Sequence, residues 1–183
     1  MGMAAPVYYT ADMVRALPDD GNRYETVHGE LLVTPSPRAI HQYVAGELFA
    51  RLHQYLKQYP LGLVFASPAD ISWAPDVLVQ PDVFVVDRTQ AATMDWVRMR
   101  SLLLAVEVLS PSTRRQDRFA KRRVYQENGV ATYWVVDPQQ RSVETWQPDS
   151  TFPVVEHERV TWEPAGSSEP LVIELASIFP SSS

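Results

Sequence analysis

The hydrophobic pattern of the chain centres on Leu102–Leu109, an uninterrupted apolar run that contains one charged residue, Glu107. An apolar run of this length is typical of a β-strand that is covered on both faces. Burying an ionised carboxylate without a partner costs several kcal/mol or forces the group to take up a proton. We therefore expect Glu107 to meet a cation, a metal ion or hydrogen-bond donors.

A helix is predicted directly after this strand, over Thr113–Asn128. Ser110-Pro111-Ser112 ends the extended conformation and offers hydroxyl caps, and Gly129 supplies a stop. Helical spacing places Asp117 and Lys121 on the face that apolar residues should bury, so they form either an exposed i,i+4 ion pair or part of a site. The residues of this face are Asp117, Ala120, Lys121, Val124 and Asn128, with Tyr125 at its edge, whereas Arg115, Arg118 and Arg122 point the other way.

The region before the central strand contains a hairpin and a long helix. A short helix is predicted over Pro6–Ala16. Tyr24–Val27 and Glu30–Thr34 flank the turn residues His28-Gly29, which predicts a β-hairpin. In Ala39–Tyr59 the apolar residues recur at helical spacing, and this pattern predicts a long helix that packs onto the hairpin.

Further strands follow, and one of them is interrupted. Leu63–Ala66 and Ala69–Trp73 are predicted strands, and Val77–Val86 is a third that contains Gln80-Pro81-Asp82. Proline cannot donate a hydrogen bond to a sheet, so Pro81 marks a strand edge, a bulge or a strand start at which Asp82 is aimed. For the polar stretch Asp87–Arg100 we expect a mobile connection.

The second half of the chain is again rich in strand patterns. Ala131–Val136 and Ser142–Trp146 are two predicted strands joined by a turn, and Val154–Trp162 and Leu171–Leu175 are expected at a sheet edge. Strands dominate, and helices lie before and after the core strands. The predicted fold class is therefore α/β or α+β, with a mixed central β-sheet flanked by helices.

Composition limits the class of protein. The chain has 183 residues, 45% of them apolar and 21% charged, which predicts a single domain over 1–183 with a substantial core. Cysteine is absent, so neither disulfides nor a thiolate zinc site can hold the fold together. Because no apolar run approaches the length of a membrane span, we expect a cytoplasmic protein without a membrane partner.

The charge distribution is uneven. A net charge of −6 argues against nonspecific coating of nucleic acid, yet eight of the sixteen basic residues lie between Arg98 and Arg123. This local positive region either grips phosphates at one site or is one solvated helix. Of the basic residues only Lys57 and Lys121 are lysines, and a lysine among arginines favours a role for its compact, proton-carrying ammonium group.

Asp82 and Glu107 form the candidate constellation. Each is a lone carboxylate in an apolar strand, and if the strands are neighbours the two carboxylates can converge on a hard cation such as Mg²⁺ or Mn²⁺. Such an ion activates water and neutralises phosphate charge, and Lys121 could orient that water or stabilise the developing charge. The alternatives are a turn-capping role for Asp82 and a buried ion pair of Glu107 with Arg123 or Lys121.

An ordered set of motifs accompanies these residues: Pro81-Asp82, Glu107–Ser112, Asp117, Lys121, Tyr125, Gly129-Val130 and Tyr133–Asp137, with Tyr24-Glu25, Gly29–Leu31 and His41 upstream. Over about residues 23–146 the set resembles the Uma-two family of restriction-endonuclease-like proteins, a branch of the PD-(D/E)XK nuclease superfamily. The resemblance implies a restriction-endonuclease-like core over 23–146, followed by C-terminal edge strands and a tail over 147–183.

The resemblance also implies a set of site residues. Asp82 and Glu107 would bind Mg²⁺ or Mn²⁺ together with the backbone carbonyl of Val108. Leu109 stands where the superfamily motif has lysine, and Lys121 on the following helix is its expected replacement. The catalytic set is then Asp82, Glu107 and Lys121.

Supporting and phosphate-binding residues complete the prediction. Glu30 is either an additional ligand for metal or water or a solvent-facing carboxylate, and His41 either contacts a phosphate or is a surface histidine at a helix end. Asp117 supports Lys121. The expected phosphate-binding residues are Arg114, Arg115, Arg118 and Arg122.

The favoured hypothesis is a metal-dependent endonuclease that hydrolyses phosphodiester bonds in DNA. Two alternatives remain open: a nuclease-like scaffold that binds nucleic acid or protein without cutting, and a small-molecule metallohydrolase. For the oligomeric state, a homodimer is one option.

Overall fold

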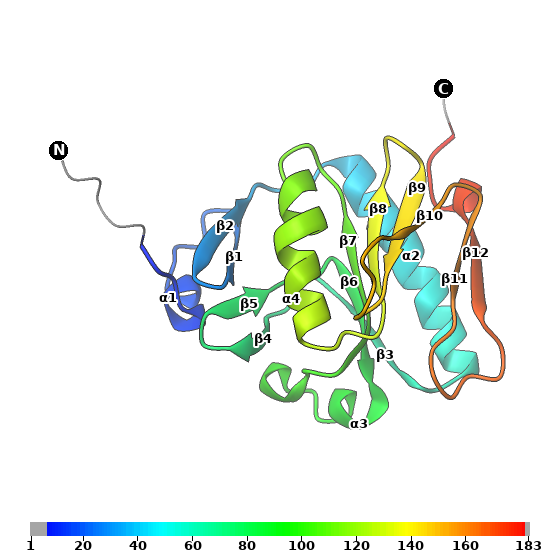
Figure 1. Cartoon of the computed structure of the whole chain (residues 1–183), viewed down its shortest axis with the longest axis horizontal. Coiled ribbons are helices and arrows are strands. Elements are labelled where there is room, and N and C mark those ends of the chain that lie inside the picture. The colour runs from blue at the N-terminus through cyan, green and yellow to red at the C-terminus, as the bar shows by residue number, and fades with distance from the viewer. Residues whose placement is uncertain (1–6, 182–183) are drawn as a thin grey trace.

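The protein is built around a mixed six-stranded sheet, seen in a computed structural model that describes residues 7–181 (Figure 1). Its strand order is β10-β9-β8-β7-β6-β3, and β7 and β8 are parallel while the other neighbours are antiparallel. The predicted mixed central sheet is confirmed. The strands are β3 (Gly62–Ala66), β6 (Val83–Asp87), β7 (Leu102–Val108), β8 (Tyr133–Asp137), β9 (Ser142–Trp146) and β10 (Val154–Glu156).

Helices cover both faces of this sheet (Figure 1). Side chains alternate along a strand, so Leu104 and Val106 of β7 pack on the side of α2 (Ala39–Gln58). Ala105 lies on the opposite side, with the π-helical turn η2 (Gln116–Lys121) and the helix α4 (Arg122–Glu127) that continues it. The predicted helix over Thr113–Asn128 corresponds to this η2–α4 segment.

The long helix packs against a different surface from the one predicted. Its buried stripe, Val44, Leu48 and Leu52, contacts the six-stranded sheet, whereas the sequence pattern alone suggested the hairpin. The helical period shows which face of a helix is apolar but not which surface covers that face. The hairpin packs instead on a short N-terminal helix.

The hairpin belongs to a second, four-stranded sheet with the order β2-β1-β5-β4. Its turn is made by His28 and Gly29, both with positive φ, as the sequence predicts. Helix α1 (Ala11–Arg15) packs on it and is shorter than the predicted Pro6–Ala16, whose first residue lies outside the described range. The strands are β1 (Arg23–Val27), β2 (Glu30–Thr34), β4 (Ile71–Ala74) and β5 (Val77–Val79).

The interrupted strand Val77–Val86 is two strands in two sheets. β5 ends at Val79 and pairs with the hairpin, and β6 begins at Val83 in the central sheet. The three residues between them, Gln80-Pro81-Asp82, therefore carry the chain from one sheet to the other. Asp82 lies at this crossing point, immediately before β6.

The polar stretch 87–100 is more ordered than a mobile connection. It contains α3 (Arg88–Ala91) and the 3₁₀ turn η1 (Trp96–Arg98). Asp87 accepts hydrogen bonds from two backbone N–H groups at the start of α3, and Met99 is buried. Capping and one buried apolar anchor thus fix a segment whose composition is typical of a loop.

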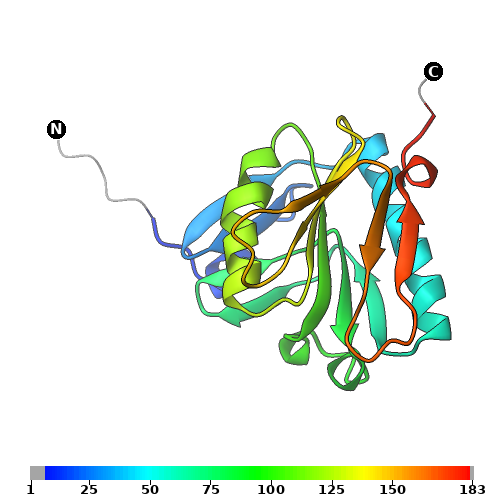
Figure 2. The ribbon, with the colours of Figure 1, turned by 45° about the vertical axis from the view of Figure 1, so that its right-hand side comes forward.

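The C-terminal segment contributes to the main core. β10 pairs with β9 at the sheet edge, and β11 (Arg159–Trp162) and β12 (Leu171–Glu174) form a hairpin alongside α2 (Figure 2). The Trp162 ring lies 5.7 Å from that of Tyr55, between ring centroids. The short turn η3 (Leu175–Ser177) follows. Across residues 7–181, no helix is both long and apolar enough to cross a membrane.

We expect Leu52→Ala to lower the free energy of unfolding by about 2–5 kcal/mol, because Leu52 is fully buried between α2 and the sheet. Gln54→Ala, at an exposed position of the same helix, should change it by less than about 0.5 kcal/mol. Chemical denaturation of both variants measures the difference, and equal stabilities would contradict the packing of α2 described above.

Candidate functional site

Sheet register brings the two predicted carboxylates together. In the antiparallel pair β6–β7, the ladder ends with Val83 opposite Val106, and Asp82 and Glu107 are the residues that lie just beyond this pair on the two segments. Both side chains are buried, with 5% of Asp82 and 1% of Glu107 exposed. The predicted neighbourhood of the two strands is therefore confirmed.

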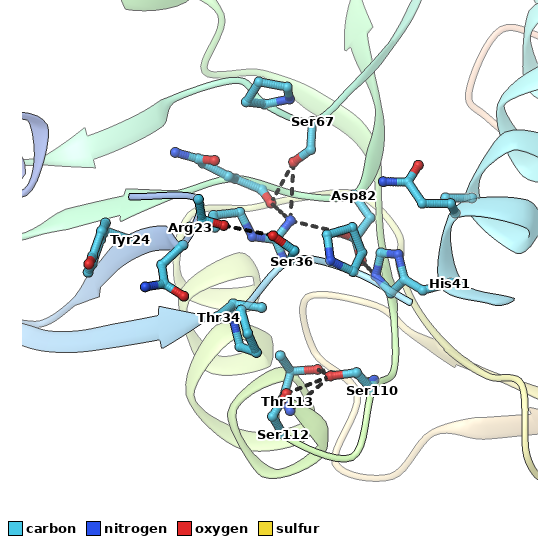
Figure 3. Close-up of a pocket in the computed structure, with 18 of the residues that line it drawn as sticks. Arg23, Tyr24, Thr34, Ser36, His41, Ser67, Asp82, Ser110, Ser112 and Thr113 are labelled. Atoms are coloured by element: carbon cyan, nitrogen blue, oxygen red, sulfur yellow. Dashed lines mark hydrogen bonds and ion pairs between the residues drawn. The ribbon is translucent and has the colours of Figure 1, made fainter. Parts of the chain in front are cut away.

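Both carboxylate oxygens of Asp82 are engaged (Figure 3). Oδ1 accepts a hydrogen bond of 2.7 Å from Arg23 Nη1, and Oδ2 is bound by His41 Nε2 at 2.9 Å and the Val108 backbone N–H at 2.8 Å. Burial alone would raise the pKa of Asp82, but the His41 hydrogen bond and the charge of Arg23 outweigh burial and lower it. Asp82 is thus held as an anion.

The surroundings of Glu107 favour its protonated form, in contrast to those of Asp82. Its Oε1 accepts hydrogen bonds from Tyr125 at 2.7 Å and from Lys121 at 3.1 Å. Its Oε2 is buried and has no hydrogen-bond partner among residues 7–181. Burial raises the pKa of Glu107 well above its ordinary value, and repulsion from Asp82 adds to this, although Lys121 lowers it in part.

Lys121 lies at the centre of three carboxylates. Its Nζ is 2.9 Å from Glu25 Oε2, 3.1 Å from Glu107 Oε1 and 3.5 Å from Asp117 Oδ1. Burial opposes the charge of Lys121, but these three carboxylates raise its pKa, so the ammonium keeps its proton. An exposed Asp117–Lys121 pair is excluded, because each residue is only 1% exposed.

A π-helical turn supplies both Asp117 and Lys121. The segment Gln116–Lys121 has the wider π-helical geometry, and the regular helix resumes at Arg122. Such turns are uncommon and frequently occur at functional sites. The Tyr133 hydroxyl holds this turn in place by donating a hydrogen bond of 2.8 Å to the backbone oxygen of Asp117.

Glu25 was not among the residues predicted for the site. It is fully buried on β1, and its Oε1 accepts a hydrogen bond of 2.7 Å from the backbone N–H of Gln80. The sequence did carry a signal, because Glu25 shares strand parity with Val27, which is buried in the core. This signal is weaker than that for Glu107, because Arg23 lies on the same face of β1. Arg23, the partner of Asp82, was missed as well.

The buried groups have an imbalance of charge. Four carboxylates, those of Glu25, Asp82, Glu107 and Asp117, face two cations, Arg23 and Lys121, which leaves a formal charge of −2 when His41 is counted as neutral. We call these six residues the acidic cluster. Uncompensated buried charge is costly, so the cluster must bind protons or a cation from solution. Burial raises the pKa of Asp117 too, in agreement with this need.

The cluster fits a divalent cation in charge and in donor type. Hard cations such as Mg²⁺ prefer carboxylate oxygens, and Glu107 Oε2 is a buried oxygen without a donor. Arg23 and Lys121, however, already pair with the neighbouring carboxylates, and among residues 7–181 no three acidic or histidine side chains are arranged as a metal site. Binding of a metal ion would therefore require Arg23 or Lys121 to shift.

A cavity of about 830 Å³ opens beside Asp82 (Figure 3). Its wall is formed by the hairpin, the first turns of α2 and the Ser110–Thr113 turn, which begins the segment leading to α4. Arg23, His41 and Asp82 line it, whereas Glu107 and Lys121 lie behind this wall. The hydroxyl-bearing residues of the wall are Tyr24, Thr34, Ser36, Ser67, Ser110, Ser112 and Thr113.

The structure does not bring every predicted residue to this place. Glu30 is exposed at the turn end of the hairpin, opposite Val27, and the hairpin contributes Glu25 instead. His41 is not a surface histidine, since it is 9% exposed and contacts Asp82.

The four arginines predicted to bind phosphate lie apart from the cavity, whose wall within residues 7–181 includes none of them. Arg114 and Arg118 form ion pairs with Asp137, and Arg118 also pairs with Glu144. Arg122 lies over the Trp146 ring, 4.5 Å from its centroid, and Arg115 is exposed. Arg123 pairs with Glu127, which leaves Lys121 as the cation of Glu107.

The raised pKa of Glu107 gives a signed prediction for Glu107→Gln. In metal-free wild type, the folded state retains the Glu107 proton to higher pH than the unfolded state, so stability is lost as pH rises between the ordinary and the raised value. Glutamine does not titrate. The stability of Glu107→Gln relative to wild type should therefore increase by about 1.4 kcal/mol per pH unit across that window.

Urea denaturation in EDTA from about pH 4 to pH 8 measures this difference. Glu30→Gln is the matched control, because the same substitution at an exposed carboxylate should give no comparable slope. A stability difference that stays constant for Glu107→Gln would show that Glu107 ionises normally.

Comparison with known proteins agrees with this architecture. The crystal structure of a putative nuclease belonging to DUF820 from Anabaena variabilis ATCC 29413 is similar, with a TM-score of 0.72 and 20% sequence identity over 93% of this chain and 97% of that chain. At this identity the likeness concerns the fold. No curated protein matches the chain. The family model named Uma2, described as a putative restriction endonuclease, matches residues 11–177, and the protein therefore belongs to the Uma2 family.

Proposed function

We propose that the protein is a Mg²⁺- or Mn²⁺-dependent endonuclease that hydrolyses phosphodiester bonds in DNA through a PD-(D/E)XK-type site. The observation that carries this proposal is the acidic cluster, with its formal charge of −2, which reaches the wall of a solvent-accessible cavity at Arg23 and Asp82. Membership of a family described as a restriction endonuclease supports a nucleic acid as substrate.

In this proposal Asp82, Glu107 and the carbonyl of Val108 hold the metal ion. The bound ion would activate a water molecule and neutralise charge on the phosphate. Lys121, which keeps its proton, stabilises negative charge that develops on the attacked phosphate. Glu25 and Asp117 act as positioning residues, because they hold the Lys121 ammonium on two sides.

Arg23 and His41 have a separate role at the cavity wall. Both contact Asp82 from the cavity side, so they are placed to meet the oxygens of an entering phosphate. Arg23 keeps its charge, since Asp82 and Glu25 raise its pKa although burial opposes them. These two residues replace Arg114, Arg115, Arg118 and Arg122 as the proposed phosphate contacts.

One observation favours a second candidate, a nuclease-fold module that binds without cutting. The carboxylates of the cluster already have internal cations, Arg23 on Asp82 and Lys121 on Glu25 and Glu107. A protein that never binds a metal ion would need this kind of internal compensation. Metal binding therefore separates the two candidates.

We expect calorimetric titration of the wild-type protein with Mn²⁺ to show binding that is lost in Asp82→Asn and Glu107→Gln. In the same variants, Mn²⁺-supported cleavage of DNA should fall at least about a hundredfold, because a metal ligand is removed rather than an outer-shell partner. Glu30→Gln should bind Mn²⁺ and cleave as wild type does.

The thermal unfolding of each variant shows whether the fold persists. Wild-type protein that binds no Mn²⁺ would favour the non-cutting module. Full cleavage by both Asp82→Asn and Glu107→Gln would remove the acidic cluster from consideration as the active site.

A further inference from the structure

We propose that the cavity beside Asp82 accepts an unpaired nucleotide strand and excludes intact duplex. This inference rests on the proposed nuclease function and adds the class of substrate to it. It follows from the burial of the reactive groups, the size of the cavity and the chemistry of its wall.

The reactive groups are too deep for a phosphate on the outside of a duplex. Lys121 and Glu107 are each 1% exposed, and the side chain of Asp82, which does reach the cavity wall, is 3% exposed. The scissile phosphate must therefore enter the cavity. A DNA duplex is stiff, with a persistence length of about 50 nm, and cannot bend its backbone into such a recess. An unpaired strand can rotate its backbone and place one phosphate there.

The cavity has the size of a small-ligand site. Its volume of about 830 Å³ lies within the range of about 300–1,000 Å³ that is usual for pockets that enclose small molecules. A nucleotide with its base and sugar fits such a volume. In Figure 3, Tyr24 and Thr34 of the hairpin lie across the cavity from His41 of α2, so a paired second strand would meet protein.

The cavity wall has the chemistry that unpaired strands require. Proteins that bind single strands combine positive charge with aromatic or apolar surfaces on which bases stack. Here the aromatic residues Tyr24 and Phe49 line the cavity, and Arg38 supplies positive charge, whereas Arg15 and Arg23 form ion pairs with Asp70 and Asp82 of the same wall, which also contains Asp19. Arg38 forms no ion pair within residues 7–181 and precedes the first turn of α2, which carries no acidic residue.

The basic segment around α4, within the described residues 7–181, has most of its arginines engaged by other side chains. Duplex binding depends on many cations that neutralise backbone phosphates. The chain has a net charge of −6, and the basic segment around α4 has its arginines Arg114, Arg118 and Arg123 in ion pairs with Asp137, Glu144 and Glu127. The recess is therefore a better candidate for nucleic-acid contact than this basic segment.

Binding in the absence of metal tests the inference without cleavage. Fluorescence anisotropy in EDTA compares one labelled DNA strand, the same strand in a blunt duplex, and its RNA counterpart. We expect at least about tenfold tighter binding of the unpaired DNA strand than of the duplex. Equal or tighter binding of the duplex, or no binding of any strand, overturns the inference. Comparison of the DNA strand with its RNA counterpart shows whether the cavity binds deoxyribose or ribose more tightly.

Gly46 allows the cavity to be filled without disturbing the fold. It lines the cavity on α2, and a Cβ placed there meets no heavy atom within 4 Å. Gly46→Leu should weaken binding of the unpaired strand by at least about tenfold, while the unfolding temperature does not fall, because leucine favours helix more than glycine does. Gln54→Leu, exposed on α2 and outside the cavity wall, is the matched control. Wild-type affinity in Gly46→Leu overturns the inference.

Cleavage assays with Mn²⁺ separate this inference from the proposed function. Substrates with single-stranded overhangs should be cut in the unpaired part, and blunt duplexes at least about tenfold more slowly. Equal cutting of blunt duplex overturns the inference while the nuclease function stands. Preferential binding of the unpaired strand without any cutting supports the inference and contradicts the proposed catalysis.

Discussion

The structure depends on the compensation of buried negative charge around Lys121. Four buried carboxylates face only two cations, and burial keeps most of this excess negative charge away from solvent. Each group is tolerated only because another element presents a partner at the right depth, such as Lys121 for Glu107 or Arg23 for Asp82. Removing one partner from such a cluster typically costs about 3–5 kcal/mol, so the cluster couples the hairpin, the central sheet and the η2–α4 segment to one another.

The topology creates this cluster at the junction of the two sheets. The crossing segment Gln80-Pro81-Asp82 contacts both sheets. The Gln80 backbone N–H donates a hydrogen bond to Glu25 of the hairpin, and Asp82 accepts one from the backbone N–H of Val108 in the central sheet. The opposite side of the helical segment is fixed separately. Asp137, fully buried at the end of β8, receives Arg114 and Arg118 and so holds the start of the helix on the sheet. Two of the four arginines that sequence inspection associates with phosphate, Arg114 and Arg118, thus orient the helix that delivers Lys121.

Sequence patterns identified the parts of the site that follow from local periodicity. Glu107 was evident as a lone carboxylate in a doubly covered strand, and helical spacing placed Lys121 on a buried face. The hairpin carries two glutamates, Glu25 and Glu30. Periodicity alone does not show how far burial extends along the hairpin, so it does not reveal that Glu25 is the buried one of the two. Ion pairing of Arg118 with Glu144 depends on contacts between distant segments, and neither helical period nor charge clustering contains that information.

Asp82 and Glu107 both belong to the acidic cluster but are not equivalent. The Val108 N–H, His41 and Arg23 favour the anion of Asp82, whereas burial and neighbouring carboxylates favour the protonated form of Glu107. A divalent cation that entered the cluster would find one carboxylate already ionised and would have to displace a proton from the other. Metal binding and proton release are then linked, as is general where a ligand must ionise before it coordinates. The same asymmetry favours a proton on Glu107 in the absence of metal, and that proton would supply part of the charge compensation that the ion would otherwise provide.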